Sequence, residues 1–412
     1  MKPSTYPMLD ATEVERIVLE LTPVLPQEAV PLARAVGRVA ADDVRAPHAL
    51  PAFPSSAVDG YAVRAADGGG RLRIVGESAA GHPFTAELPK GGAARILTGA
   101  VLPPGADSVV MVEETTAADG WVTVPAGIAA GRNFHAPSAD LRAGELVISK
   151  GEPLGASELG LLAAMNLPTV KVGRRPRVAL MSTGDELREL GDELGSGQIT
   201  DSNRYALLAA LTEAGADVDL LGIAPDEPAR LRHLVERALG SADVLLTSGG
   251  VSVGTHDLVK PLLESLGTVH TGRVKLKPGK PFTFATLPGA KVAFGLPGFP
   301  VSSLVTFEVF VRPALRKMQG FKSLRRPTLP VRMGYDARAA GDRTEYQRVT
   351  LHRRGRDLIA ETTGSQSSSR LMSMAGAHAL VRIPPGDEGI AAGAIVEAII
   401  LALPSDSSPS SG

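Results

Sequence analysis

A regular alternation of apolar runs and amphipathic segments between residues 178 and 318 constrains the fold more than any other feature. The short apolar runs predict buried strands, and the segments between them repeat apolar residues at helical spacing. Strands that alternate with helices in this way form a parallel sheet covered by helices on both faces. We therefore expect a three-layer α/β domain here. Its predicted strands are Val178–Ser182, Val218–Ile223, Asp243–Thr247 and Val292–Leu296, and its predicted helices are Ser202–Ala214, Glu227–Leu239, Asp257–Leu266 and Val301–Met318.

Segments with β texture lie on both sides of this domain. Short β-prone runs broken by Gly and Pro begin near Asp43, and they predict a β-rich insertion between two helical parts of the chain. After Pro327, similar runs predict a small β-barrel or sandwich of about 80 residues. Residues 404–412 are rich in Ser and Pro, which predicts a flexible tail.

The composition excludes several kinds of chemistry. The chain has no cysteine, which excludes disulfides, thiolate zinc sites, iron–sulfur clusters and a cysteine nucleophile. Its 43 basic and 44 acidic residues are spread along the sequence, so nothing indicates a nucleic acid or an anionic membrane as a partner. No signal peptide and no apolar run long enough to span a bilayer is found, so we expect a cytoplasmic protein.

Glycine, hydroxyl and acidic residues follow four of the predicted strands. The carboxyl ends of parallel strands meet at one edge of a sheet, where ligands bind. Backbone amides at glycine-rich turns approach phosphate closely. Each turn alone also fits ordinary turn chemistry, but four at one edge predict an anion site. The residues predicted to bind substrate there are Ser182, Thr183, Gly184, Asp185, Ser248, Gly249, Gly250, Ser252, Gly254, Pro297, Gly298 and Ser302.

Carboxylates crowd the same edge. Asp185, Glu186, Asp226 and Asp257 would repel one another there unless a cation neutralised them. Oxygen ligands suit a hard ion such as Mg²⁺ that also bridges to substrate phosphate. The alternative is that some of these carboxylates are helix caps that face water.

Three lysines lie within six residues. Alternation places Lys275 and Lys277 on one face of a strand, and a Pro-Gly turn presents Lys280. Three ammonium groups this close form a good clamp for an oxyanion, although solvated lysines on an edge strand are the alternative. The sequence has no P-loop, nucleophile elbow or zinc-protease helix, and the first turn lacks the glycine pattern of nicotinamide binding.

Several motifs together resemble the molybdopterin molybdenumtransferase family, which includes the C-terminal domain of gephyrin. The resemblance runs from about residue 8 to residue 403, and the motifs occur in the family's order. They are the Gly-Gly-Val-Ser-Val-Gly turn with Asp257, Lys277–Pro281, Gly295–Ser303, Ser56–Val63, Leu97–Glu113, Thr344–Val349 and Gly364–Ser367.

The resemblance implies an architecture of four parts. These are a helical hinge region (residues 1–42 and 141–172), a β-rich insertion module (43–140), an α/β molybdopterin-binding domain (173–324) and a C-terminal β-barrel (325–403). Members of the family are homodimers. Their active-site cleft lies between the α/β domain of one protomer and the β-rich module of the other.

The resemblance also implies a reaction, the Mg²⁺-dependent insertion of molybdate into adenylylated molybdopterin, which gives molybdenum cofactor and AMP. In this reading Glu186 and Asp257 hold Mg²⁺, Thr98 contributes to substrate binding, and the three lysines stabilise the charge that develops. The family's catalytic acidic residues map onto Asp59, Asp140, Glu186, Asp226 and Asp257.

Two other functions stay open at this point. One is a molybdopterin adenylyltransferase, although such an enzyme needs neither the β-rich insertion nor the barrel. The other is a carrier or scaffold that binds molybdopterin without catalysis. Protein partners that fit the resemblance are a molybdopterin adenylyltransferase and the apo-molybdoenzymes that receive the cofactor. Molybdate and tungstate are too similar in size and charge for the sequence to distinguish them.

Overall fold

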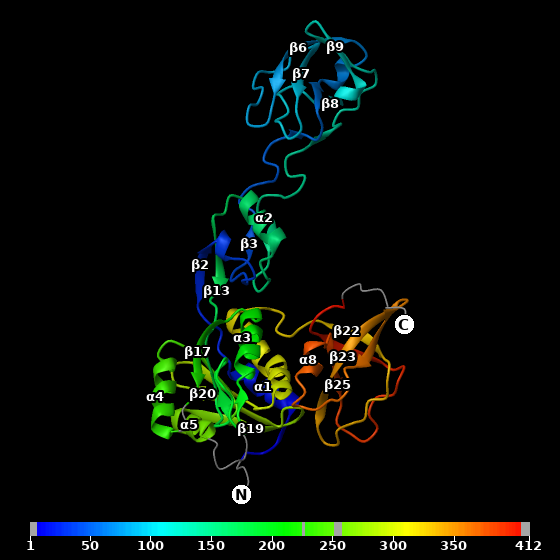
Figure 1. The fold of residues 1–412 in the computed structure, drawn as a ribbon. Coiled ribbons are helices and arrows are strands. Elements are labelled where there is room, and N and C mark those ends of the chain that lie inside the picture. The colour runs from blue at the N-terminus through cyan, green and yellow to red at the C-terminus, as the bar shows by residue number, and fades with distance from the viewer. Residues whose placement is uncertain (1–5, 225–226, 251–257, 405–412) are drawn as a thin grey trace.

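The computed structural model describes residues 6–224, 227–250 and 258–404, which form an elongated molecule (Figure 1). A β-rich module lies at one end, a narrow hinge lies in the middle, and the α/β domain and the barrel lie side by side at the other end. The predicted fold class, a multidomain α/β protein with a C-terminal barrel, is confirmed. None of the helices in these residues is long and apolar enough to cross a membrane.

Four parallel strands form the centre of the α/β domain. In spatial order they are β17 (Asp217–Ile223), β14 (Arg177–Ser182), β18 (Val244–Ser248) and β21 (Lys291–Leu296). The sheet continues through β20 (Pro281–Leu287) and β19 (Thr268–Lys277), which pair antiparallel. The sequence analysis did not place these two strands in the sheet. The turns on either side of β20 are too short for the crossover that parallel pairing needs, so these neighbours are antiparallel.

Helices cover both faces of this sheet. On one face α1 (Ala11–Leu21), α3 (Asn203–Glu213), α6 (Pro300–Thr306) and α7 (Arg312–Gln319) pack over a core that includes Leu180, Leu246 and Phe294. The π-helical turn Phe307–Val311 joins α6 to α7. On the other face lie α4 (Pro228–Leu239) and α5 (Val259–Leu266).

The N-terminal helix belongs to the α/β domain by its contacts. Val14 and Val18 of α1 are fully buried in the core of that domain. The short strand β1 (Leu9–Asp10) pairs with β19. The family resemblance placed residues 1–42 in the hinge, and apolar periodicity predicts that a helix forms but not which core it covers.

The hinge and the distal module have separate cores. The hinge contains β2 (Gln27–Pro31), the 3₁₀ turn Leu32–Arg34, β3 (Val44–Arg45), β12 (Leu146–Ile148), α2 (Ala156–Ala164) and β13 (Thr169–Gly173) around buried Leu154 and Leu162.

The distal module holds a six-stranded sheet in the order β8, β5, β7, β6, β10, β9. Its strands are β5 (Gly60–Val63), β6 (Arg71–Ser78), β7 (Gly92–Ile96), β8 (Ser108–Met111), β9 (Thr116–Ala118) and β10 (Trp121–Thr123), with the short pair β4 (Ser55–Ser56) and β11 (Phe134–His135) and the 3₁₀ turns Ala65–Asp67 and Val112–Glu114.

The C-terminal region is a closed five-stranded barrel, one of the two architectures that the sequence predicted. Its strands are β22 (Thr328–Met333), β23 (Thr344–Arg354), β24 (Asp357–Thr362), β25 (Ala379–Ile383) and β26 (Ile395–Ile400), and α8 (Met372–Ala375) precedes β25. Strand β23 also pairs with β19, where Lys277 lies opposite Glu345. The barrel is therefore hydrogen-bonded to the α/β sheet.

Candidate active site

A cavity of about 1270 Å³ opens at the carboxyl ends of β14, β18 and β21. We call this cavity the cleft. Residues 183–186 line it after β14, Gly249 and Gly250 after β18, and Pro297, Gly298 and Ser302 after β21. The turn after β19 adds Lys277 and Lys280. The structure thus brings most of the described residues predicted to bind substrate to one sheet edge.

Gly249 is required by the geometry of the turn that follows β18. Its φ of +87° is one that residues with a side chain rarely adopt, and a Cβ atom there would lie 2.4 Å from the carbonyl oxygen of Thr183. The absence of a side chain therefore lets the third turn pack directly against the first. The backbones of these two turns therefore lie against each other at the floor of the cleft.

Three side chains hold the turns of the cleft together. The Asn203 Nδ2 group donates hydrogen bonds to Ser248 Oγ (2.8 Å) and to the carbonyl oxygen of Gly298 (2.7 Å). Ser303 Oγ donates to the carbonyl oxygen of Pro297 at 2.6 Å. Ser248, which was predicted to bind substrate, is thus buried and bonded within the protein. The sequence analysis missed Asn203, because an Asn that begins a helix looks like an ordinary cap.

Three hydroxyl groups beneath the cleft have unused hydrogen-bonding capacity. Ser182 Oγ, Thr183 Oγ1 and Thr247 Oγ1 are buried and have no hydrogen-bond partner among the described residues. A buried polar group without a partner costs about 1–3 kcal/mol. A ligand or water that supplies the missing partners would therefore be favoured here, most directly at Thr183, which lines the cleft.

The three predicted lysines have different surroundings. Lys277 lines the cleft, and its Nζ lies 3.2 Å from Oε1 of Glu345, whose side chain is 2% exposed. Lys280 is exposed in the cleft and forms no ion pair with a described residue. The Nζ of Lys275 lies 3.6 Å from Oδ1 of Asp10, and Lys275 does not line the cleft. Two of the three lysines therefore face the space where an anion would bind.

The predicted carboxylates are only partly placed by the structure. Asp185 and Glu186 line the cleft and are exposed. Asp226 and Asp257 lie outside the described residues, as do Ser252 and Gly254. Within residues 6–224, 227–250 and 258–404, no group of three or more acidic or histidine side chains is arranged to hold a metal ion. Glu186 is thus the one member of the predicted metal pair that the structure places at the cleft.

Asp59 and Thr98 lie together in the distal module. Asp59 Oδ1 accepts hydrogen bonds from the backbone N–H and from Oγ1 of Thr98, both at 2.7 Å. These two bonds, the backbone one first, lower the pKa of Asp59 because they favour the charged carboxylate. Two residues selected from separate motifs are therefore in direct contact.

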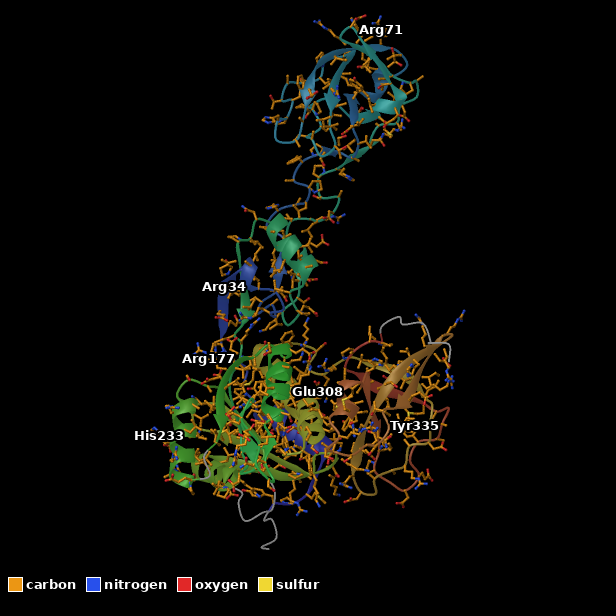
Figure 2. All side chains as sticks on the ribbon, viewed as in Figure 1. Arg34, Arg71, Arg177, His233, Glu308 and Tyr335 are labelled. Atoms are coloured by element: carbon orange, nitrogen blue, oxygen red, sulfur yellow. The ribbon has the colours of Figure 1, made fainter. Side chains whose placement is uncertain are left out.

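This pair is far from the cleft of its own chain. The distal module lies at the opposite end of the molecule from the α/β domain, as the positions of Arg71 and Glu308 also show (Figures 1 and 2). Asp140 is exposed on the segment between the distal module and the hinge, where its backbone N–H donates to the carbonyl oxygen of Leu50 at 3.0 Å. A single chain does not bring Asp59 or Asp140 to the cleft.

The barrel contributes a wall of the cleft that the sequence analysis did not predict. Arg343 and the segment Gln366–Ser369 line the cavity, and the carbonyl oxygen of Ser368 accepts a hydrogen bond from the backbone N–H of Val301 at 3.1 Å. The signals in the sequence were the motif Gly364–Ser367, which overlaps this segment, and the motif Thr344–Val349 beside Arg343. Both were noted as family motifs, but neither was assigned to the site.

Three segments of the chain match known protein families. Residues 9–166 match the MoeA N-terminal region (domain I and II), residues 179–317 match a probable molybdopterin binding domain, and residues 330–401 match the MoeA C-terminal region (domain IV). Together these matches cover the hinge, the distal module, the α/β domain and the barrel.

Individual relatives match over nearly the whole chain. A molybdopterin molybdenumtransferase from Nostoc is 39% identical, and the match covers 97% of this chain and 94% of the relative. Gephyrin from Dictyostelium discoideum is 35% identical over 97% of this chain, which spans 63% of gephyrin's length. A solved structure of a molybdopterin biosynthesis MoeA protein from Pyrococcus horikoshii is 32% identical with a TM-score of 0.81, covering 96% of this chain and 99% of that one.

Proposed function

Because the chain belongs to the molybdopterin molybdenumtransferase family of enzymes, we propose that it inserts molybdate into adenylylated molybdopterin and releases AMP. The observation that carries this proposal is the cleft itself. Glycine turns, the buried hydroxyl group of Thr183, which has no partner among the described residues, and two lysines converge there on a space large enough for a nucleotide-sized ligand. Such a site suits a ligand with several negative charges.

We assign the anionic parts of the substrates to the residues that face the cleft. The backbone of the Gly249–Gly250 turn would approach a phosphate, and the hydroxyl group of Thr183 would gain a hydrogen-bond partner. Lys277 and Lys280 would attract molybdate and stabilise negative charge as the phosphoanhydride breaks. Arg343 adds a third cation from the barrel.

We propose that Mg²⁺ assists this reaction. The exposed carboxylate of Glu186 in the cleft is the type of oxygen donor that Mg²⁺ prefers, and Asp257 is the predicted second ligand. Bound Mg²⁺ would neutralise charge on the pyrophosphate and so weaken the bond that breaks. Asp226 is proposed as a further acidic residue at the same edge.

We also propose that the enzyme works as a homodimer. Asp59 and Thr98 form a prepared carboxylate site that is remote from the cleft of the same chain. In a two-fold dimer the distal module of one protomer would reach the cleft of the other, with Asp140 on the segment that carries it there. Each dimer would then contain two complete sites.

The test is AMP release from adenylylated molybdopterin, with Mg²⁺ and molybdate added separately and together. Release that requires both ions would support the insertion reaction. Tight binding of the substrate without release would instead favour a carrier or scaffold. Formation of adenylylated molybdopterin from ATP and molybdopterin would favour the adenylyltransferase alternative.

A further inference from the structure

Arg348 is a buried charged residue in a strand of the barrel. It lies in β23 with 0% of its surface exposed, and no carboxylate of the described residues lies within ion-pair distance. Burial lowers the pKa of its guanidinium group to about 10, so the group still carries its charge at neutral pH. An isolated buried charge lowers stability unless its donors are hydrogen-bonded. Burying an apolar side chain at this position would cost less free energy than burying a charge. The reason for an arginine must therefore lie in the hydrogen bonds that its guanidinium group donates.

The hydrogen bonds of Arg348 lead to the loop between β24 and β25. Its Nη2 donates to the carbonyl oxygen of Ser367 at 3.2 Å, and its Nε donates to Ser373 Oγ at 3.2 Å. The backbone N–H of Arg348 donates to Gln366 Oε1 (2.9 Å), and Gln366 Nε2 donates to the carbonyl oxygen of Arg348 (3.0 Å). A third guanidinium contact, from Nη1 to the carbonyl oxygen of Tyr346, is 3.4 Å long. The loop is thus bonded to one buried residue at several points.

The same loop forms the barrel's wall of the cleft. Gln366, Ser367, Ser368 and Ser369 all line the cavity. The loop is also bonded to the start of α6, where the carbonyl oxygen of Ser368 accepts a hydrogen bond from the Val301 N–H. Arg348, in strand β23, is therefore hydrogen-bonded to the same segment that lines the ligand space.

We propose that Arg348 is a positioning residue, which fixes the segment Gln366–Ser369 as a wall of the cleft and so sets the affinity for the anionic substrate. The identity of that substrate rests on the function proposed above. The placement of the segment by Arg348 does not depend on it.

The chemistry of the side chain explains why other residues would do this less well. A guanidinium group is planar and presents five donors, so it can bond to the Ser367 carbonyl and the Ser373 hydroxyl at the same time. A lysine keeps the charge but offers one compact ammonium group. A methionine keeps much of the volume and offers no donor. The expected order of function is therefore arginine, then lysine, then methionine.

The experiment compares Arg348→Met and Arg348→Lys with Arg326→Met. Arg326 is also mostly buried, with a side chain 10% exposed, and is ion-paired with Glu308 and Glu213, but it does not line the cleft. AMP release is measured against the concentration of adenylylated molybdopterin with Mg²⁺ and molybdate present, and amide hydrogen exchange is measured over residues 363–373. We expect Arg348→Met to raise KM about tenfold with kcat within about twofold, since one hydrogen-bonded wall of the binding site is loosened. Exchange over residues 363–373 should become faster, Arg348→Lys should lie between, and Arg326→Met should change neither.

Specific results would overturn the proposal. One is unchanged exchange over residues 363–373 in Arg348→Met, and another is an equal rise of KM in Arg326→Met. A fall in kcat with KM unchanged would also contradict a positioning role. If Arg348→Met does not fold, Arg348→Lys alone must show the faster exchange. If the unmodified protein releases no AMP, the proposed function fails, whereas the exchange measurements still decide whether Arg348 positions the segment.

Discussion

The cleft and the distal module each contain part of the predicted site, and they differ in how complete each part is. In the cleft, turns from several strands, a lysine-bearing hairpin and a barrel loop enclose one cavity. In the distal module, Asp59 and Thr98 form a small, exposed pair at the other end of the molecule (Figure 1). Residues can therefore be arranged locally for chemistry although no substrate site of their own chain surrounds them. The missing surroundings must come from another chain if Asp59 acts on the substrate.

The largest effect is expected from mixing two inactive variants. Asp59→Ala removes the distal carboxylate and Asp257→Ala removes a predicted metal ligand, so each homodimer should lose more than about hundredfold in AMP release. In a mixed dimer, one cleft would pair an intact α/β domain with an intact distal module. When equal amounts of the two variants dissociate and reassociate, about half of the dimers are mixed, and each mixed dimer has one intact site of its two. The mixture should therefore recover about a quarter of the normal activity.

The control is a mixture of Asp59→Ala with unmodified protein, which reveals any loss caused by exchange itself. Both variants should keep the far-UV circular dichroism of the unmodified protein, because Asp59 is exposed and Asp257 is predicted to lie in a turn. No recovery in the mixture, although mixed dimers are detected by mass, would show that the distal carboxylate serves its own chain or does not act.

The second prediction compares glycines in the two regions. At Gly249 an added methyl group would meet the Thr183 carbonyl at 2.4 Å, whereas at Gly120, in the distal module, nothing lies within 4 Å. Both residues have a positive φ, +87° and +78° respectively, so both alanine variants share the backbone strain of about 1 kcal/mol or more. Gly249→Ala should also displace the floor of the cleft. We expect substrate binding to weaken more than tenfold in Gly249→Ala only.

Calorimetric titration with adenylylated molybdopterin would check this difference, and thermal unfolding would check the shared strain. If Gly120→Ala weakens binding as much as Gly249→Ala, backbone strain alone explains the loss. The close approach of the two turns would then not contribute to substrate binding.

The sequence was most informative where structure is local. The predicted strands and helices of the α/β domain agree with the observed elements to within about two residues, because buried strands and amphipathic helices have clear periods. The described parts of the turns after β14, β18 and β21 were located correctly for the same reason. The family, recognised from motifs in several parts of the chain, is confirmed by the matched segments.

What could not be predicted depends on pairing between distant segments. The barrel wall reaches the cleft because β23 pairs with β19, and because Arg348 holds the loop that contains Ser367. No periodicity in either segment indicates these contacts. The separation of Asp59 from the cleft likewise depends on the hinge between them, whose length and direction follow from packing around Leu154 and Leu162.

The third prediction separates the lysines that face the cleft from the one that does not. Lys277→Ala alone would leave the buried carboxylate of Glu345 without its partner, so the variant to use is Lys277→Ala with Glu345→Gln. It should raise the molybdate concentration needed for half-maximal AMP release about tenfold, since a charge-assisted contact is lost. Lys275→Ala, which removes the partner of Asp10 outside the cleft, should change this concentration by less than about twofold. Equal effects of the two variants would move the anion site away from Lys277.

The smallest effect is expected in the distal module and concerns pH. Thr98→Val removes the hydroxyl hydrogen bond to Asp59 and keeps the stronger backbone one. The pKa of Asp59 is lowered by both bonds, so losing one should raise it partway toward its ordinary value. Any activity or stability that depends on the ionised carboxylate is present above the unfolded pKa and is lost as pH falls through the folded pKa. The acidic limb of the AMP-release profile should therefore move to higher pH.

Thr115→Val is the matched control for this measurement. Thr115 lies in the same module, and its hydroxyl group donates to the carbonyl oxygen of Val112 rather than to a carboxylate. Its loss should leave the acidic limb in place. If the acidic limb moves by the same amount in Thr115→Val, the stability of the distal module, and not the pKa of Asp59, determines the position of that limb. Suppose that the mixing experiment has shown that Asp59 acts across the dimer. If the acidic limb of Thr98→Val does not move in that case, contacts from the partner replace the hydroxyl group once the cleft is assembled.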